Sequence, residues 1–272
     1  MLHEAIDGVV IRARDMGDHD RYLTLLTSEK GRLTVLAKGS RSMRGTQMAV
    51  SQLYSYGNYE IYRRGELYIL KSGSPNRIFY ELCRDIDKIN LAAYLCDLAY
   101  ELTDEGEPAE EMLRLLLNSL YALDQGLYPQ EIIKGAFEMR AAAVSGYAPE
   151  LDACAHCSAA AQDPFYLDVM NGALVCSDCL KRRAAQTKGT GDYDEIREAE
   201  VLCMLPSAAH AALRYTVTAP LARLFAFDLK DADDLHHIVS AAETYLLYHL
   251  GRGFDSLNFY RTMRQNTEGT KT

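Results

Sequence analysis

The feature that most constrains this chain is a set of four cysteines arranged as two Cys-x-x-Cys pairs. The pairs "CAHC" and "CSDC" are separated by 18 residues and contain Cys154, Cys157, Cys176 and Cys179. The segment "PFYLDVMNGALVC" between them is typical of a hairpin with a turn at Asn171-Gly172, which would bring the pairs together. Four thiolates in tetrahedral geometry suit Zn²⁺, and a closed four-ligand shell indicates a structural site. The spacing therefore predicts one structural zinc ion per chain.

Other uses of these cysteines fit less well. Two disulfides would need an oxidising compartment, which nothing in the sequence indicates. A redox-active Cys-x-x-Cys usually opens a helix after a strand, and two copies at this spacing fit that arrangement poorly. His156 could replace one thiolate but is more often a bystander at such a position. Cys83, Cys96 and Cys203 lie in segments that we predict to be helical, and we expect them to be small core residues.

The first 80 residues predict a small β-barrel. Two apolar runs, Tyr22–Thr27 and Leu33–Ala37, flank a Ser-Glu-Lys-Gly turn, and "QLYSYGNYEIYRR" alternates with a period of two. β-branched and aromatic residues are frequent, and glycine turns recur at short spacing. Because no long helical segment interrupts these runs, a parallel sheet is not expected.

From about residue 80 the apolar residues recur every three or four positions, which predicts helices. We expect a second helix to begin at Pro108 and end at Gly126, and a third to run from Pro129 to Gly146. Helices return from about Tyr193. The expected fold is α+β and multidomain: a β-barrel at 1–80, then a mainly α-helical domain at 81–272 with an inserted zinc-binding module of four cysteines at about 150–190.

The charge is unevenly distributed along the chain. The net charge is -9, yet residues 1–80 hold 12 Lys+Arg against 8 Asp+Glu, while the remainder holds 17 against 30. No acid occurs from Lys30 to Tyr59, and the loop "VLAKGSRSMRG" carries Lys38, Arg41 and Arg44. This asymmetry suggests different partners for the two halves, although a solvated surface without a partner is the plain alternative.

Several classes of protein are not expected from this sequence. No run of about 18 apolar residues occurs, so no transmembrane helix is predicted. The first residues, "MLHEAIDGVV", lack the pattern of a signal peptide, so we expect a cytoplasmic protein. The motifs GxxxxGK[ST], HExxH and GxSxG are missing, and no catalytic constellation replaces them. We therefore expect a protein that is not an enzyme.

Several stretches resemble the RecO family of bacterial DNA repair proteins. They are "GDHDRYLTLLTSEKGRLTVLAKGSRSMRG", "QLYSYGNYEIYRRGELYILKS", "FEMRAAAVSGYAPELDACAHC", "GALVCSDC" and "YHLGRGFDSLNF". They follow in order over nearly the whole chain. The sequence departs from the family pattern at Ser158, where a glycine commonly follows the second cysteine, and at Gly172-Ala173, where Gly-Gly is usual. Both positions concern turn geometry and not the proposed ligands.

The resemblance implies an N-terminal OB-fold, a helical domain and an inserted zinc-binding module. It also implies a role in recombinational repair. Proteins of this family bind single- and double-stranded DNA and anneal complementary strands. Together with RecR they help to load RecA onto DNA that is coated by the single-strand binding protein. Neither metal-dependent chemistry nor nucleotide hydrolysis is implied.

An OB barrel binds nucleic acid with a basic groove that follows the phosphates and with aromatic faces that stack on bases. We expect Lys38, Arg41 and Arg44 to contact phosphates and not base edges, because an annealing protein must tolerate any sequence. The full set of basic candidates is Lys30, Arg32, Lys38, Arg41 and Arg44. The stacking candidates are Tyr54, Tyr56 and Tyr59.

The resemblance further implies that the helical domain receives the acidic, apolar C-terminal tail of the single-strand binding protein. Such a peptide needs an apolar groove with a cation at its edge. The third predicted helix offers Phe137, Met139 and Arg140 together. In the alternative interpretation, the first two belong to the core and Arg140 is merely solvated.

Two other functions remain open on the sequence. The chain could be a docking adaptor whose basic loop binds an acidic protein, or a zinc-ribbon transcription factor. Strand annealing would favour the repair function, and binding confined to proteins would favour the adaptor. Sequence-specific binding to duplex DNA would favour the transcription factor.

Overall fold

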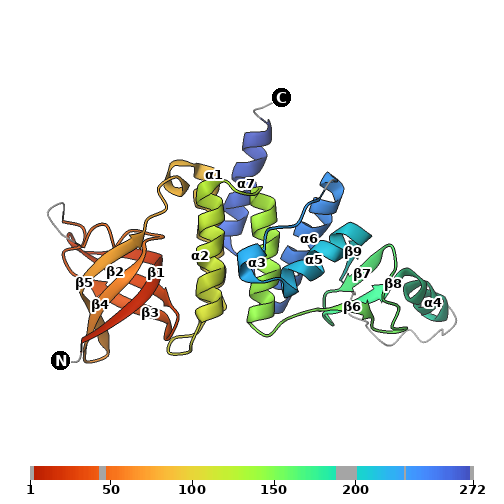
Figure 1. Ribbon diagram of the computed structural model, residues 1–272, viewed down its shortest axis with the longest axis horizontal. Coiled ribbons are helices and arrows are strands. Elements are labelled where there is room, and N and C mark those ends of the chain that lie inside the picture. Colours follow the sequence, from red (N-terminus) through yellow and green to blue (C-terminus); the bar gives the residue numbers. More distant parts are fainter. Residues whose placement is uncertain (1–2, 43–46, 188–200, 230, 270–272) are drawn as a thin grey trace. The chain divides into compact units, whose positions relative to one another are not determined.

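The computed structural model describes residues 3–42, 47–187, 201–229 and 231–269 (Figure 1). The chain divides into two compact units. The first contains Met1–Tyr128 and Phe254–Thr272, and the second contains Pro129–Gly253. This division reflects packing, and the domain limits expected at residue 80 and at about 150–190 stay a prediction.

The first unit contains a closed five-stranded barrel with the order β1-β2-β3-β5-β4. Its strands are β1 (His3–Met16), β2 (Asp20–Thr27), β3 (Gly31–Ala37), β4 (Tyr56–Arg64) and β5 (Leu67–Arg77). The β3–β5 pair is parallel, and the other neighbouring pairs are antiparallel. The barrel and the helical remainder confirm the predicted fold class.

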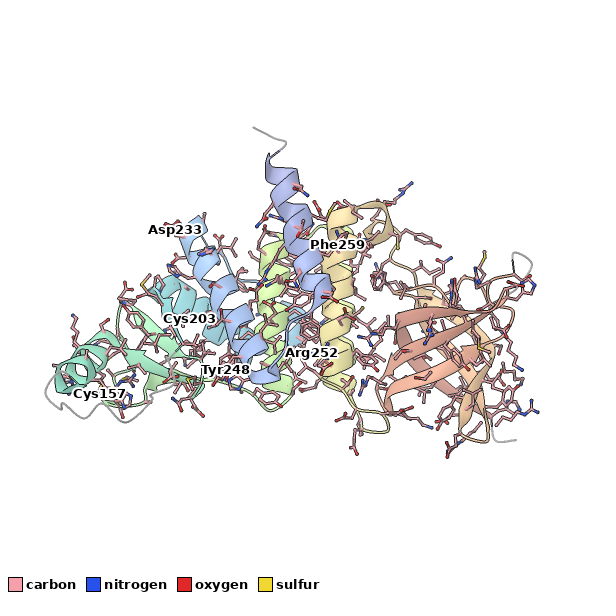
Figure 2. All side chains as sticks on the ribbon, turned by 180° about the vertical axis from the view of Figure 1, so that it is seen from behind. Cys157, Cys203, Asp233, Tyr248, Arg252 and Phe259 are labelled. Atoms are coloured by element: carbon pink, nitrogen blue, oxygen red, sulfur yellow. The ribbon has the colours of Figure 1, made fainter. Side chains whose placement is uncertain are left out.

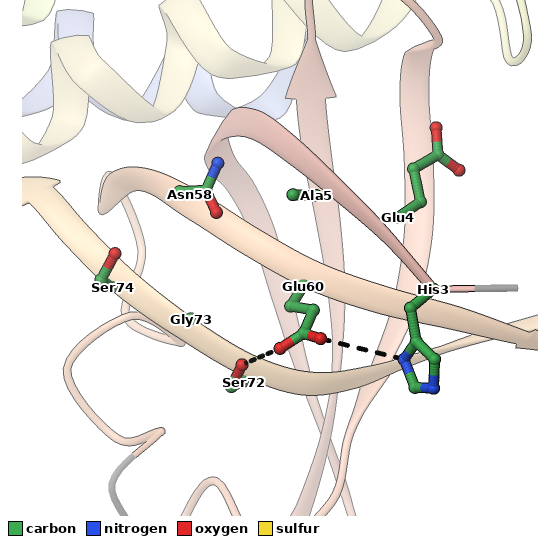
Figure 3. A pocket seen from close by; sticks show the side chains of 8 residues that line it. All are labelled: His3, Glu4, Ala5, Asn58, Glu60, Ser72, Gly73 and Ser74. Atoms are coloured by element: carbon green, nitrogen blue, oxygen red, sulfur yellow. Dashed lines mark hydrogen bonds and ion pairs between the residues drawn. The ribbon is translucent and has the colours of Figure 1, made fainter.

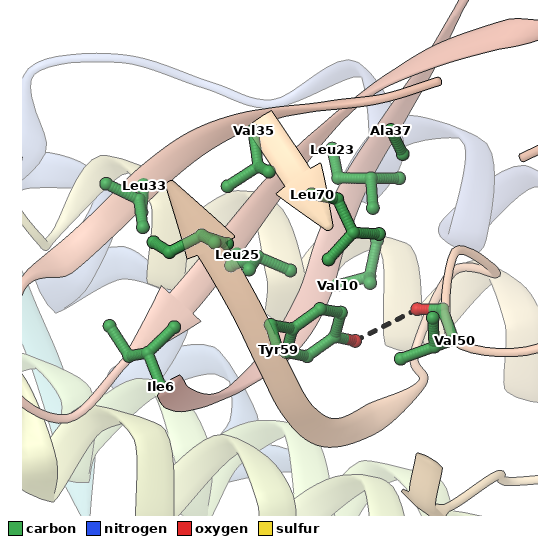
Figure 4. Packing of buried hydrophobic residues seen from close by; sticks show 11 residues of the cluster. Ile6, Val10, Leu23, Leu25, Leu33, Val35, Ala37, Val50, Tyr59 and Leu70 are labelled. Atoms are coloured by element: carbon green, nitrogen blue, oxygen red, sulfur yellow. Dashed lines mark hydrogen bonds between the residues drawn. The ribbon is translucent and has the colours of Figure 1, made fainter. Parts of the chain in front are cut away.

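Alternate residues of the barrel strands form a closed apolar core (Figure 4). Leu23 and Leu25 of β2 face inward together with Val35 of β3, as the period of two predicts. Val50, from the segment between β3 and β4, packs against the same core. The Tyr59 hydroxyl donates a hydrogen bond to the Val50 carbonyl at 3.0 Å, so it ties this segment to the barrel.

Helices α1, α2 and α7 complete the first unit, and α1 packs against the other two. Asp85 caps α1 by accepting hydrogen bonds from the N–H groups of Asp87 and Lys88. The second predicted helix ends at Gly126, in the left-handed conformation (φ 61°), as the sequence indicates. The helices are η1 (Leu82–Arg84), α1 (Ile86–Glu101), α2 (Glu110–Gln125) and α7 (Asp255–Gly269).

The second unit combines helices with a four-stranded sheet of order β6-β8-β7-β9. Its strands are β6 (Glu150–Cys154), β7 (Phe165–Asp168), β8 (Ala173–Cys176) and β9 (Leu202–Leu205). Its helices are α3 (Gln130–Val144), α4 (Ser177–Thr187), α5 (Ser207–Thr218), η2 (Leu221–Arg223) and α6 (Ala232–Leu250). Helix α3 packs against α5 and α6. None of the helices within the described ranges has the length and hydropathy needed to span a membrane.

The cysteines outside the two pairs follow the prediction only in part. Cys96 is buried in α1, as expected. Cys83 is exposed in η1, so its assignment to the core is wrong. Cys203 lies on strand β9 and not on a helix, because the short apolar run "VLCML" pairs with β7. Short apolar runs do not distinguish helix from strand by periodicity alone.

Candidate metal centre and nucleic-acid interface

The four predicted metal ligands converge at one end of the β6–β9 sheet. The antiparallel β7–β8 hairpin turns at Gly172 (φ 62°), as predicted. This hairpin brings Cys176, at the end of β8, to Cys154, at the end of β6. The four sulfur atoms lie within 4.8 Å of one another. Cys157, labelled in Figure 2, is the exposed member of the group.

The geometry of the sulfur atoms fits a metal and not a disulfide. The Sγ atoms of Cys157 and Cys176 are 3.7 Å apart. Zn–S bonds of about 2.3 Å in a tetrahedron place sulfurs about 3.8 Å apart, whereas a disulfide bond is about 2.05 Å long. The Cys176 N–H donates to Cys154 Sγ at 3.3 Å, and the Cys179 N–H donates to Cys176 Sγ at 3.4 Å. Such N–H donors stabilise the thiolate form that a metal requires.

The thiols differ in how readily they ionise. Burial opposes ionisation of Cys154, but hydrogen bonds from the backbone of Cys176, His156 and Cys157 outweigh it and lower its pKa to about 6. Burial, together with hydrogen bonds to the neighbouring sulfurs, raises the pKa of Cys179 to about 12. The guanidinium of Arg182 donates to Cys179 Sγ at 2.9 Å. Cys154 therefore ionises more readily than Cys179, and a bound cation would favour the thiolate form of both.

The turn after the first cysteine pair explains why glycine is the usual residue at the position of Ser158. Its N–H donates to the Cys154 carbonyl at 2.8 Å, and its φ is 57°. A left-handed conformation is uncommon for a residue other than glycine, so glycine is the natural choice there. The departure changes a turn residue and leaves the four sulfur atoms together. His156 is exposed beside the cluster.

Lys30 and Arg32 lie in a stretch of sequence without acids, but in the folded chain each has an acid beside it. Lys30 Nζ lies 2.7 Å from a Glu4 carboxylate oxygen on β1, and this hydrogen bond raises the lysine pKa. Arg32 lies 3.6 Å from a carboxylate oxygen of Asp104, in the loop between α1 and α2, and its guanidinium stacks 4.2 Å from the Tyr100 ring centre. The premise that no acid lies nearby is therefore wrong for these two cations.

Arg41 is similarly engaged. Its side chain lies 3.3 Å from an Asp15 carboxylate oxygen and donates to the Gly17 carbonyl at 2.9 Å. Its backbone N–H donates to the His19 carbonyl at 3.1 Å. Arg41 thus fastens the loop after β3 to the turn between β1 and β2, and only part of its charge remains for a ligand.

Of the basic-loop residues that the structure describes, Lys38 has the most open surroundings. It is exposed directly after β3, and within the described part of the chain it forms no ion pair. Gly39 follows with φ 65°, and its N–H donates to the Asp20 carboxylate at 2.8 Å, which fixes the start of the loop. Arg44 lies outside the described residues.

Two of the three predicted stacking tyrosines are buried. Tyr54 is 5% exposed and Tyr59 is fully buried, with its hydroxyl donating to the carbonyls of Val50 and Ser55. Burial raises the pKa of both. A buried ring has no face for a base, so the prediction is wrong for these two. Tyr59 shares a strand face with Ile61, and this alternation could have indicated its place in the core. Tyr56 is half-buried.

The sequence argument missed Arg14 and Tyr22. They are directly opposed on β1 and β2, and they face away from the core because Ala13 and Leu23 face into it. Arg14 is exposed and forms no ion pair within the described residues. A period-two assignment of β1 and β2 would have placed both on the outer face of the barrel.

A pocket of about 500 Å³ on β1, β4 and β5 contains two carboxylates among its lining residues, unlike the basic loop after β3 (Figure 3). Glu60 accepts hydrogen bonds from Lys71 and Ser72, each at 2.6 Å, which lower its pKa, and it lies 4.0 Å from His3. Glu4 also lines this pocket. Because two carboxylates face it, this surface is unsuited to DNA phosphates.

The predicted peptide groove on the third helix is not an open surface. Phe137 and Met139 are fully buried in α3. Arg140 donates from Nε to the Thr216 carbonyl at 2.8 Å and from Nη2 to the Ala219 carbonyl. It thereby satisfies carbonyl groups at the end of α5. The prediction is wrong for Phe137 and Met139, whose side chains are packed inside the unit.

Comparisons with known proteins agree over most of the chain. The family described as "Recombination protein O N terminal" matches residues 1–79, and "Recombination protein O C terminal" matches residues 83–191. A DNA repair protein RecO of Acetivibrio thermocellus is 27% identical over 257 residues, covering 94% of this chain and 95% of the relative.

Two further relatives, both described as DNA repair protein RecO, are more similar over a shorter stretch. The protein from Shouchella clausii is 34% identical over 176 residues, covering 65% of this chain and 68% of the relative. The protein from Anaeromyxobacter sp. (strain K) is 36% identical over 177 residues, covering 64% and 69% respectively. With its closed barrel, its helices and its four clustered cysteines, this chain belongs to the RecO family of DNA repair and recombination proteins.

Proposed function

We propose that this protein binds single-stranded DNA through its barrel and anneals complementary strands. With RecR, it would help to load RecA onto DNA coated by the single-strand binding protein. The observation that carries the proposal is Lys38, exposed and unpaired among the described residues, at the end of β3 of a closed barrel in a RecO-family chain. Barrels of this kind bind strands with cations that follow the phosphates and with rings that stack on bases.

The basic residues divide into two roles in this proposal. Lys38 and Arg44 contact phosphates, and Arg14 adds a cation on the outer face next to Tyr22. Lys30, Arg32 and Arg41 hold the surrounding turns through their ion pairs and contribute mainly to the local field. Phosphate contacts carry no sequence information, which suits a protein that anneals any pair of strands. The protein needs no catalytic group for this, because annealing is a binding function.

The four clustered cysteines would hold one structural Zn²⁺. Their closed set of four sulfur donors suits this ion, and a closed shell leaves no position for a substrate. Bound zinc would fasten the ends of β6 and β8 to the first turn of α4. Its contribution in this proposal is to stability and not to a reaction.

The other partners are RecR, RecA (acting indirectly), double-stranded DNA and the acidic tail of the single-strand binding protein. The side chains of Phe137 and Met139 on α3 are not accessible to the tail, since both are buried. The tail must therefore find an apolar groove on other helical residues. DNA binding would place the protein on the nucleoid, in the cytoplasm.

The salt dependence of DNA binding tests the proposal. Each phosphate contact on a single strand contributes about -0.7 to the slope of log K against log salt concentration. We expect Lys38→Gln to flatten the slope by about 0.7 for every sequence, measured by fluorescence anisotropy with labelled oligonucleotides. Lys71→Gln is the matched control, because Lys71 is on the same barrel but is held by Glu60 at 2.6 Å.

Competition and annealing assays complete this test. Unlabelled single strands and duplexes of several sequences should compete without sequence preference, and the wild-type protein should accelerate annealing of complementary strands. A wild-type protein that binds no DNA would remove the proposal and favour the adaptor. Binding restricted to one duplex sequence would instead favour a transcription factor.

A further inference from the structure

A second acid-free basic stretch lies in the acidic half of the chain. No Asp or Glu occurs between Asp178 and Asp192, and this interval carries Lys181, Arg182, Arg183 and Lys188. The first three lie on α4, and Lys188 is outside the described residues. Acids outnumber cations in residues 81–272 as a whole, but this stretch carries four cations and no acid.

The stretch lines a pocket beside the cysteine cluster. The pocket has a volume of about 210 Å³ and is lined by His156, Cys179, Arg182 and Arg183. Two arginines of α4 and a histidine from the turn of the first cysteine pair thus line the same pocket. Among the residues that the structure describes, no carboxylate lines this pocket, in contrast to the pocket on the barrel that contains Glu4 and Glu60.

The hydrogen bond from Arg182 to Cys179 Sγ, at 2.9 Å, orients the guanidinium at the edge of the pocket. A guanidinium has five N–H donors in a fixed plane, so one bond to sulfur leaves donors for an oxyanion. Arg183 is half-buried, and Lys181 is exposed with no ion pair in the described part of the chain.

We propose that α4 and His156 form a phosphate-binding site that takes a phosphodiester group of bound DNA, so that the cysteine module is a second DNA contact. Guanidinium pairs are the side chains best matched to phosphate oxygens. The inference rests on the proposed DNA-binding function and adds a second region to it. Free phosphate has the same chemistry as the backbone group, and the experiment separates these two sources.

The main variant is Lys181→Gln combined with Arg183→Gln, which removes one cation that lines the pocket and the exposed cation two residues before it on α4, and keeps Arg182 and all four cysteines. Two lost phosphate contacts should flatten the salt slope for single-stranded DNA by about 1.4, with metal content unchanged by elemental analysis. The control is Arg223→Gln, an exposed arginine of η2 in the same unit and outside the pocket, which should keep the wild-type slope. If the double variant does not fold, Arg183→Gln alone, at a position that lines the pocket, should flatten the slope by about 0.7.

An unchanged slope in a folded, metal-loaded double variant would overturn the inference. Calorimetric titration with inorganic phosphate tests whether the pocket binds the free anion. If the double variant loses phosphate binding while its salt slope for DNA stays unchanged, the pocket is a site for free phosphate and not for DNA. The Lys38→Gln variant distinguishes failure of the second contact on α4 from failure of the proposed DNA-binding function. DNA binding that depends on Lys38 and not on α4 removes only the second contact, whereas a wild-type protein that binds no DNA removes the proposed function itself.

Discussion

The barrel and the cysteine sheet are both small β structures, yet they are closed in different ways. The barrel is closed by strand pairing around a core to which all five strands contribute buried side chains. The strands of the sheet have only four or five residues each. His210 of α5 and His249 of α6 form hydrogen bonds with the carbonyls of Leu151 and Val169, and the four sulfur atoms gather near the ends of β6 and β8. A repeating apolar pattern can close a barrel unaided, whereas clustered thiolates need a cation.

The largest effect is expected when one of the four clustered cysteines is replaced. Cys176→Ser should abolish stoichiometric zinc and unfold the region around 150–187, because structural zinc contributes about 10–16 kcal/mol in small zinc-dependent folds. Elemental analysis and regional hydrogen exchange would measure the two consequences, and the barrel should keep its protection. Cys83→Ser, an exposed cysteine outside the cluster, is the control. If wild-type protein contains no metal and is still fully protected from exchange at 150–187, the cysteine sheet is stable without a cation and does not differ from the barrel in this respect.

A smaller effect tests how the barrel turn meets its neighbouring loop. Gly31 has φ 54°, and a Cβ there would lie 2.1 Å from the Asp104 carbonyl oxygen and 2.5 Å from that of Glu107. Gly31→Ala should therefore displace the loop and cost about 3 kcal/mol in urea unfolding. Gly65→Ala shares the left-handed conformation but meets nothing within 4 Å, so it should cost only about 1 kcal/mol. Equal costs would show that the loop does not press on this turn.

The barrel core is tested by the buried hydroxyl of Tyr59. Tyr59→Phe leaves the carbonyls of Val50 and Ser55 without this donor and should cost about 1–2 kcal/mol of unfolding free energy. Tyr62→Phe, on the same strand and less deeply buried, should change stability by less than about 0.5 kcal/mol. The DNA salt slope should be the same in both variants. An unfolding free energy that changes no more in Tyr59→Phe than in Tyr62→Phe would show that this hydroxyl does not stabilise the barrel.

The smallest expected effect separates two cations of one loop. Arg41→Gln loses the ion pair with Asp15 and the bond to Gly17, and should cost about 0.5 kcal/mol, as exposed ion pairs do. Lys38→Gln should leave stability unchanged and alter only the DNA salt slope. Urea unfolding measured beside the anisotropy titrations distinguishes the two roles. The reverse pattern, with Lys38 affecting stability and Arg41 only binding, would invert the assignment.

Several features of this protein could be predicted from the sequence because they depend on neighbouring residues. The alternation in β2 and β3 places Leu23, Leu25 and Val35 inside the barrel. Gly126 ends α2 where a left-handed residue is needed, and a single hairpin suffices to bring the two cysteine pairs together. Each of these depends on backbone geometry and apolar spacing within about 30 residues, which the chain displays directly.

Other features were decided only when distant segments met. Glu4 lies beside Lys30 because β1 and the β2–β3 turn are neighbours in the barrel, so an acid-free stretch of sequence is not acid-free in space. Phe137, a candidate for the peptide groove with the core as the alternative, is buried because α5 and α6 pack against α3. Electrostatic and packing energies depend on separation in space, and the fold sets that separation through contacts that local spacing does not display.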